Sequence, residues 1–155
     1  EAVERLQPAA AIYFSMSEDD LRQILRFEHA MIGSDGLPGD PHPHPRLWGT
    51  FPRVLGHYVR ELGLIPLEHA VHRMTGLSAT NFGLRDRGHL RAGAFADIVI
   101  FDPDSVAANA TYGDPYLKPT GIEHVLVAGR PVVVAGERIE GRYPGRRMLG
   151  GVVEP

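Results

Sequence analysis

Cysteine is absent from this 155-residue sequence, so disulfides and thiolate metal ligands are excluded within it. No apolar run approaches the ~20 residues that a membrane-spanning helix needs, and the first residues, EAVERLQPAAA, lack the pattern of a signal peptide. Positive charge is not in excess either. The net charge is −3, which gives no electrostatic reason to expect a nucleic acid or an anionic membrane as partner. These absences favour a cytoplasmic protein.

Several catalytic motifs are also missing. The sequence has no glycine-rich phosphate loop, no Gly-x-Ser-x-Gly elbow and no recognisable Ser-His-Asp arrangement. What it does have is the composition of a globular domain, with 43% hydrophobic and 23% charged residues and enough length for a sizeable core. Its 18 glycines and 13 prolines predict many turns.

The beginning of the chain predicts a strand, a helix and a second strand. Residues 17–27 form the helix, with Ser17 as N-cap, acidic residues in the first turn and an apolar stripe along one face. Short apolar runs at residues 9–16 and 30–32 are strand-like. This order predicts a βαβ unit, which requires a parallel sheet.

The character of the sequence changes near residues 80–88. Before this boundary we expect three more helices, and after it short β-branched strands separated by glycine or aspartate. The helices are expected at residues 46–63, 66–75 and 77–84. Residues 125–127 and 132–134 are expected to pair as a hairpin. The prediction is therefore an α/β segment followed by an all-β segment.

Asp35 lies directly after the strand-like run at residues 30–32, within the stretch MIGSDG. Active-site residues of parallel α/β folds gather at the carboxyl ends of strands, and Asp35 would have this position. The alternative is a simple turn residue, because Ser-Asp-Gly also favours a turn.

The loop after Asp35 contains further polar candidates. His42 and His44 have a His-x-His spacing that can chelate a metal when it lies on a strand. Here prolines flank both histidines, which favours an extended loop at the rim of a site. Arg46 could bind a substrate carboxylate through parallel hydrogen bonds, or it could be a surface charge at a helix start.

Three longer stretches carry a resemblance to a known family. HPRLWGTFPRVLG is specific to one branch of enzymes, and GHLRAGAFADIVIFD and GIEHVLVAGRPVV are typical of a wider superfamily. Together they resemble the C-terminal third of N-acyl-D-amino-acid deacylases (D-aminoacylases), which belong to the metal-dependent amidohydrolase superfamily. The resemblance extends over residues 13–145, nearly the whole chain.

The resemblance implies a fold in two parts. Residues 1–84 would be the last βα units of a (β/α)8 TIM-type barrel, in which residues 30–32 form the eighth strand. Residues 85–155 would be the C-terminal share of a small β-sandwich domain. The change of character near residues 80–88, seen in the sequence itself, agrees with this division.

The resemblance also implies roles for four residues in the hydrolysis of an N-acyl-D-amino acid to a free D-amino acid and a carboxylate. Asp35 matches the acid/base that touches the zinc centre, of one or two ions. Arg46 matches the residue that binds the α-carboxylate of the substrate, and Tyr13 and Met16 match positions that line its pocket.

The other metal ligands of the family, an early His-x-His, a cysteine and two later histidines, have no counterpart in this sequence. We therefore expect the chain to need the remainder of the barrel, as an N-terminal segment or a companion chain, and to be inactive and without tight zinc binding alone. Two alternatives remain. One is another amidohydrolase of the same layout, acting on a cyclic amide as dihydroorotases and hydantoinases do. The other is a non-catalytic assembly module.

Overall fold

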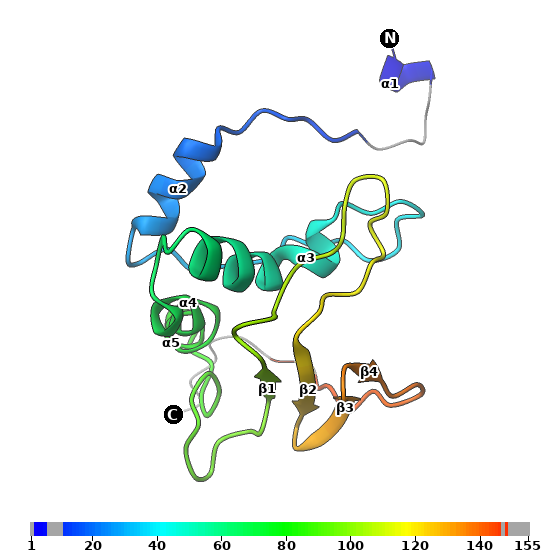
Figure 1. Ribbon diagram of the computed structural model, residues 1–155. Coiled ribbons are helices and arrows are strands. Elements are labelled where there is room, and N and C mark those ends of the chain that lie inside the picture. Colours follow the sequence, from blue (N-terminus) through cyan, green and yellow to red (C-terminus); the bar gives the residue numbers. More distant parts are fainter. Residues whose placement is uncertain (1, 6–10, 147, 149–155) are drawn as a thin grey trace.

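The computed structural model describes residues 2–5, 11–146 and 148. In this part of the chain, six helical elements precede a four-stranded sheet (Figure 1). The helical elements are α1 (Ala2–Arg5), α2 (Glu18–Arg26), α3 (Arg46–Arg53), the π-helix η1 (Val54–Glu61), α4 (Leu67–Met74) and α5 (Gly76–Asn81). The strands are β1 (Ile98–Phe101), β2 (Ile122–Val127), β3 (Arg130–Val134) and β4 (Glu137–Arg138).

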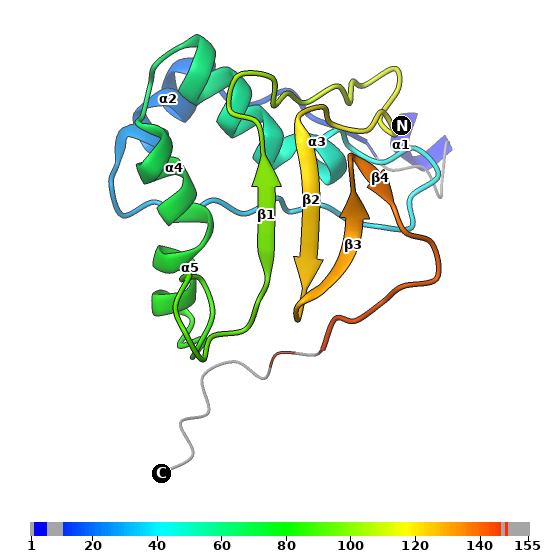
Figure 2. The same cartoon turned by 60° about the horizontal axis from the view of Figure 1, so that its bottom comes forward.

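The sheet is an antiparallel meander in the order β1-β2-β3-β4, with the helices beside it (Figure 2). The predicted hairpin is confirmed as β2 and β3. It turns at Ala128 and Gly129, whose positive φ angles of 49° and 74° match the right-handed twist of the strands. The last strand, β4, contains only two residues.

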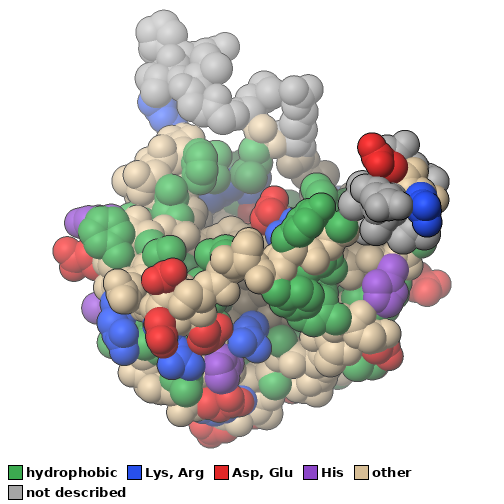
Figure 3. Space-filling model, turned by 90° about the horizontal axis from the view of Figure 1, so that it is seen from above, with side chains coloured by type: hydrophobic (Ala, Val, Ile, Leu, Met, Phe, Trp, Pro, Cys, Tyr) green, Lys and Arg blue, Asp and Glu red, His purple; other side chains and the backbone are tan. Residues whose placement is uncertain are grey.

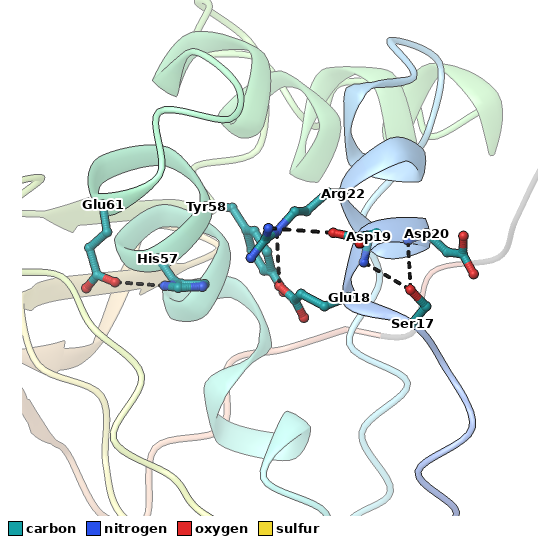
Figure 4. Close-up of polar contacts among 8 residues, drawn as sticks. All are labelled: Ser17, Glu18, Asp19, Asp20, Arg22, His57, Tyr58 and Glu61. Atoms are coloured by element: carbon teal, nitrogen blue, oxygen red, sulfur yellow. Dashed lines mark hydrogen bonds and ion pairs between the residues drawn. The ribbon is translucent and has the colours of Figure 1, made fainter.

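Helix α2 confirms the first predicted helix and is fixed at its start by polar contacts (Figure 4). The Ser17 hydroxyl accepts hydrogen bonds from the amides of Asp19 and Asp20, as an N-cap does. The hydroxyl of Tyr58 on η1 donates to the Glu18 carboxylate at 3.0 Å. The first turn of α2 is therefore attached to η1.

The predicted helix over residues 46–63 is formed by two elements of different winding, α3 and η1. Pro52 lies inside α3 and has no backbone N–H to donate. Beyond Arg53 the helix has the wider π geometry, and the Leu62 amide at its end donates to the His57 carbonyl at 3.0 Å. The helix predicted over residues 66–75 is confirmed as α4, and the one over 77–84 begins and ends earlier, as α5.

Neither of the two predicted parallel strands is formed. Residues 11–16 and 30–32 lie outside any strand, and the start of the first prediction, residues 9–10, lies outside the described residues. A strand exists only where a neighbouring strand completes its hydrogen bonds. Within the described ranges no strand pairs with either segment, so both are extended or irregular backbone.

The hydrophobic core joins the helices to the loop that follows β1. Its buried members come from α2, η1, the η1–α4 turn, α4 and this loop: Leu25, Val54, Leu55, Tyr58, Ile65, Ala70 and Val106. Val106 is only 1% exposed, and Phe101 of β1 and Ile122 of β2 pack against the same cluster. The sheet is thus anchored to the helices on which the candidate site is built.

Candidate functional site

Asp35 lies in the irregular segment between α2 and the start of α3. The amide of Ile32 donates to the carbonyl of Arg73 on α4 at 3.3 Å, which holds the chain three residues before Asp35. Asp35 has a φ of 48°, a left-handed conformation that aspartate tolerates. Gly36 follows, and a Cβ there would lie 3.0 Å from the Cα of Leu47. The backbone beside Asp35 therefore lies directly against α3.

Arg46, the first residue of α3, pairs with Asp35. Its Nη2 lies 2.9 Å from Oδ2 of Asp35, so the structure brings together two of the four residues that the sequence singled out. The Asp35 side chain is 77% exposed and that of Arg46 37%. Nε of Arg46 is buried and has no hydrogen-bond partner among the described residues. The guanidinium therefore has a donor left for an additional acceptor.

His42 and His44 face Tyr112 in the loop between β1 and β2. The Nε2–H of His42 donates to the Tyr112 carbonyl at 2.7 Å. Nδ1 of His44 accepts the Arg46 amide proton at 3.0 Å, so its proton is assigned to Nε2, which lies 3.4 Å from the Tyr112 hydroxyl. Partial burial and the nearby Arg46 lower the pKa of His44, against the opposing effect of Asp35. Both imidazoles are thus held by hydrogen bonds, and their place at the rim of an active site stays a prediction.

Tyr13 and Met16 lie in the extended segment that precedes α2. Their side chains are 76% and 74% exposed. No hydrogen bond, ion pair or ring contact within the described ranges joins them to Asp35 or Arg46. The structure thus leaves these two predicted pocket residues apart from the ion pair.

Sequence reasoning missed Tyr112. Its ring makes edge contacts with Phe14, at 5.0 Å between centroids, and with His44, at 5.2 Å. The stretch NATYGDPYLKP around Tyr112 reads as an ordinary turn, and no local signal distinguishes this tyrosine from Tyr116 in the same loop.

The described residues do not form a metal site by themselves. No group of three or more His, Cys, Asp or Glu side chains within residues 2–5, 11–146 and 148 could hold an ion. Asp35 is a single carboxylate that forms an ion pair with Arg46. A carboxylate is a ligand type that zinc accepts, and Asp35 supplies one.

A model of the amidohydrolase family matches residues 1–133. The chain belongs to this family. Among its curated relatives, a D-aminoacylase of Alcaligenes xylosoxydans xylosoxydans is 61% identical over 132 residues, which are 85% of this amidohydrolase chain and 27% of the relative.

Two solved structures are similar to this amidohydrolase chain. One is a D-aminoacylase with a binuclear metal centre, which is 55% identical with a TM-score of 0.86. The match covers 91% of this chain and 30% of the D-aminoacylase chain. The other is an N-acyl-D-glutamate deacylase of Bordetella bronchiseptica, complexed with zinc and a phosphonate inhibitor that mimics the tetrahedral intermediate. It is 56% identical with a TM-score of 0.81, and the match covers 83% of this chain and 27% of the deacylase chain.

The chain thus spans less than a third of the length of each of these relatives. Among the helices of its described part, none is long and apolar enough to cross a membrane.

Proposed function

We propose that this chain is the C-terminal segment of a zinc-dependent hydrolase that deacylates N-acyl-D-amino acids to a free D-amino acid and a carboxylate. The observation that carries the proposal is the 2.9 Å contact between Asp35 and Arg46. It places a carboxylate beside a guanidinium that has an unused buried donor. An amide hydrolase acting on a substrate with a free carboxylate needs both groups.

The proposed fold of the complete protein is a (β/α)8 barrel with a small β-sandwich. Residues 1–84 would contribute its last βα units, and residues 85–155 the C-terminal share of the sandwich. The extended backbone at residues 11–16 pairs with no strand among the described residues. This supports the proposal, because neighbouring strands of a complete barrel could pair with it. The antiparallel sheet β1–β4 supports the second part. Asp35 would then lie at the end of a barrel strand, where active sites of this fold are found.

Asp35 would be the acid and base of the reaction and one ligand of the zinc centre. Bound zinc supplies Lewis acidity, which makes water a nucleophile near pH ~7 and polarises the amide carbonyl. The Asp35 carboxylate accepts a proton from the attacking water and later delivers a proton to the leaving amine. The remaining ligands would come from the rest of the barrel, either an N-terminal segment or a companion chain.

Arg46 would bind the α-carboxylate of the substrate. The planar guanidinium of Arg46, whose side chain is 37% exposed, can donate two parallel hydrogen bonds to a carboxylate. Without substrate, the Asp35 carboxylate occupies one side of this guanidinium. Tyr13 and Met16 would line the pocket once the barrel brings the extended segment to the site.

The test is Asp35→Asn in the full-length protein that contains this chain, assayed with zinc on N-acetyl-D-methionine. We expect turnover to fall by about 10² to 10⁴, the usual contribution of a positioned acid/base. Asp40→Asn is the matched control, because Asp40 lies in the same exposed loop and only its carbonyl is bonded, to Tyr116. An Asp35→Asn enzyme as active as the parent would exclude the assigned role.

A substrate panel separates the rival functions. Hydrolysis of hydantoin or dihydroorotate in preference to N-acyl-D-amino acids would favour an amidohydrolase for cyclic amides. Zinc-loaded full-length protein without turnover on either class would favour an assembly module.

A further inference from the structure

The loop between β1 and β2, residues 102–121, leaves the sheet and extends over α3 (Figure 1). It packs closely there, since a Cβ added to Gly49 of α3 would lie 3.3 Å from the Cβ of Ala108. The loop is stiffened by a turn in which the Asp114 amide donates to the Thr111 hydroxyl at 2.9 Å and the Thr111 amide donates to the Asp114 carbonyl at 3.0 Å. Tyr112 stands inside this turn.

Tyr112 touches both segments that carry the proposed substrate residues. On one side its ring meets Phe14, from the extended segment that contains Tyr13 and Met16. On the other side its ring meets the imidazole of His44, and its hydroxyl lies 3.4 Å from Nε2 of that residue. Its carbonyl also accepts from His42 at 2.7 Å. One residue of the β-rich half thus contacts the two separate parts of the candidate site.

His44 transmits this contact to Arg46. Helix α3 has Pro45 at its N-cap position, with no side-chain cap. The amides of Leu47 and Trp48 donate to the carbonyls of His44 and Pro45, so the Arg46 amide is the one that these carbonyls do not serve. Nδ1 of His44 accepts the amide of Arg46 at 3.0 Å and replaces that cap. The imidazole of His44 therefore holds the backbone of Arg46, whose guanidinium extends toward Asp35.

We propose that Tyr112 is a positioning residue for substrate binding, which orients Arg46 through His44 and holds the segment of Tyr13 and Met16 through Phe14. The effect of Tyr112 on enzyme kinetics that we expect rests on the proposed function. Tyr112 itself touches neither Asp35 nor Arg46, so its effect is on binding of the substrate and not on the proton transfer.

The kinetic test uses two variants of the zinc-loaded full-length enzyme. Tyr112→Ala removes the ring contacts and the hydroxyl, and we expect KM for N-acetyl-D-methionine to rise about tenfold while kcat stays within about twofold. Tyr112→Phe keeps the rings and loses a long, weak hydrogen bond, so a rise of about twofold to threefold is expected. Tyr143→Ala, at an exposed tyrosine away from the site, is the control. A Tyr112→Ala enzyme that loses kcat with KM unchanged would overturn the proposal.

A double-mutant cycle tests the path through Arg46. Arg46→Ala alone should raise KM, and adding Tyr112→Ala should raise it little further, because the group being positioned is already gone. Fully additive effects on KM would show that Tyr112 acts elsewhere and would contradict the proposal.

A spectroscopic arm separates failure of this inference from failure of the proposed function. In ¹⁵N spectra of the chain, the ring nitrogens of His44 should show the neutral form protonated at Nε2, and Tyr112→Ala should shift these signals and the Arg46 amide. His69, on the exposed face of α4, serves as an internal reference. If the parent enzyme does not hydrolyse N-acyl-D-amino acids, these shifts still decide the positioning role. Unchanged His44 and Arg46 signals would refute it.

Discussion

Asp102, at the end of β1, organises the loop that brings Val106 into the core. Its carboxylate accepts the Ser105 hydroxyl at 2.6 Å and the Asp104 amide at 3.0 Å. Its carbonyl accepts the Val106 amide at 2.9 Å. The side-chain bond from Ser105, followed by the backbone bond from Asp104, lowers the pKa of Asp102 below its ordinary value of 3.8. These bonds favour the ionised form in the folded state.

Asp102→Asn should therefore lower the Tm of the chain at neutral pH. The folded-state pKa is depressed, so the ionised carboxylate stabilises the fold at every pH above 3.8, and this contribution is lost as the pH falls through the folded-state pKa. The Tm difference between parent and variant, followed from neutral pH downward, should shrink below about pH 4. Asp104→Asn is the matched control, because only the backbone of Asp104 takes part. A Tm difference that persists unchanged in acid would contradict this assignment.

At the scale of single residues, local motifs singled out Asp35 and Arg46 as candidates but not Tyr112. The first two stand in short stretches whose residue types indicate a turn and a helix start. The link between Tyr112 and His44 joins positions 68 residues apart in the chain. Such a contact depends on how the sheet docks on the helices, which no local pattern encodes. Whether Tyr13 and Met16 line a pocket stays a prediction.

At the scale of elements, α2, α4 and the β2–β3 hairpin could be predicted because their signals are local: an N-cap, an apolar stripe and a two-residue turn. The two parallel strands could not be, because strand formation depends on partners distant in sequence. The π winding of η1 has no reliable sequence pattern either, although it follows directly after the proline-containing α3.

The packing of η1 against the β1–β2 loop depends on Gly56. A Cβ at this position would lie 2.5 Å from the carbonyl oxygen of Val106, a distance that only backbone movement could relieve. The same oxygen accepts a hydrogen bond from Nη1 of Arg60 at 2.6 Å. The close approach thus both buries Val106 and satisfies its carbonyl.

We expect Gly56→Ala to destabilise the chain by about 1–3 kcal/mol, as overpacking of a core contact does, even though alanine favours a helix more than glycine. Urea denaturation gives the free energy of unfolding. Gly33→Ala is the control, since a Cβ there would meet nothing within 4 Å. A Gly56→Ala protein more stable than the parent would show that η1 is not held against the loop in this way.

At the scale of the whole molecule, large apolar side chains remain exposed on the part of the chain between α1 and α3. They are Ile12, Tyr13, Phe14, Met16, Ile24, Phe27, Met31 and Leu37, with exposed fractions of 40% to 79%. Hydrophobic side chains also gather on the face that Figure 3 presents, which is the side of residues 11–16 in Figure 1. An exposed apolar surface of this kind marks an interaction site. The proposed partner is the remainder of the barrel.

Amide hydrogen exchange tests this partner directly. Residues 11–16 make no backbone hydrogen bond to any other described residue, so their amides should exchange close to the unprotected rate in the isolated chain. In the full-length protein, pairing with neighbouring barrel strands should slow the same amides by at least about 100-fold. The amides of β2 between β1 and β3 are the internal control, because both neighbours are present in either protein. Residues 11–16 that exchange equally fast in both proteins would mean that no strand adds to this segment, and the proposed barrel would fail.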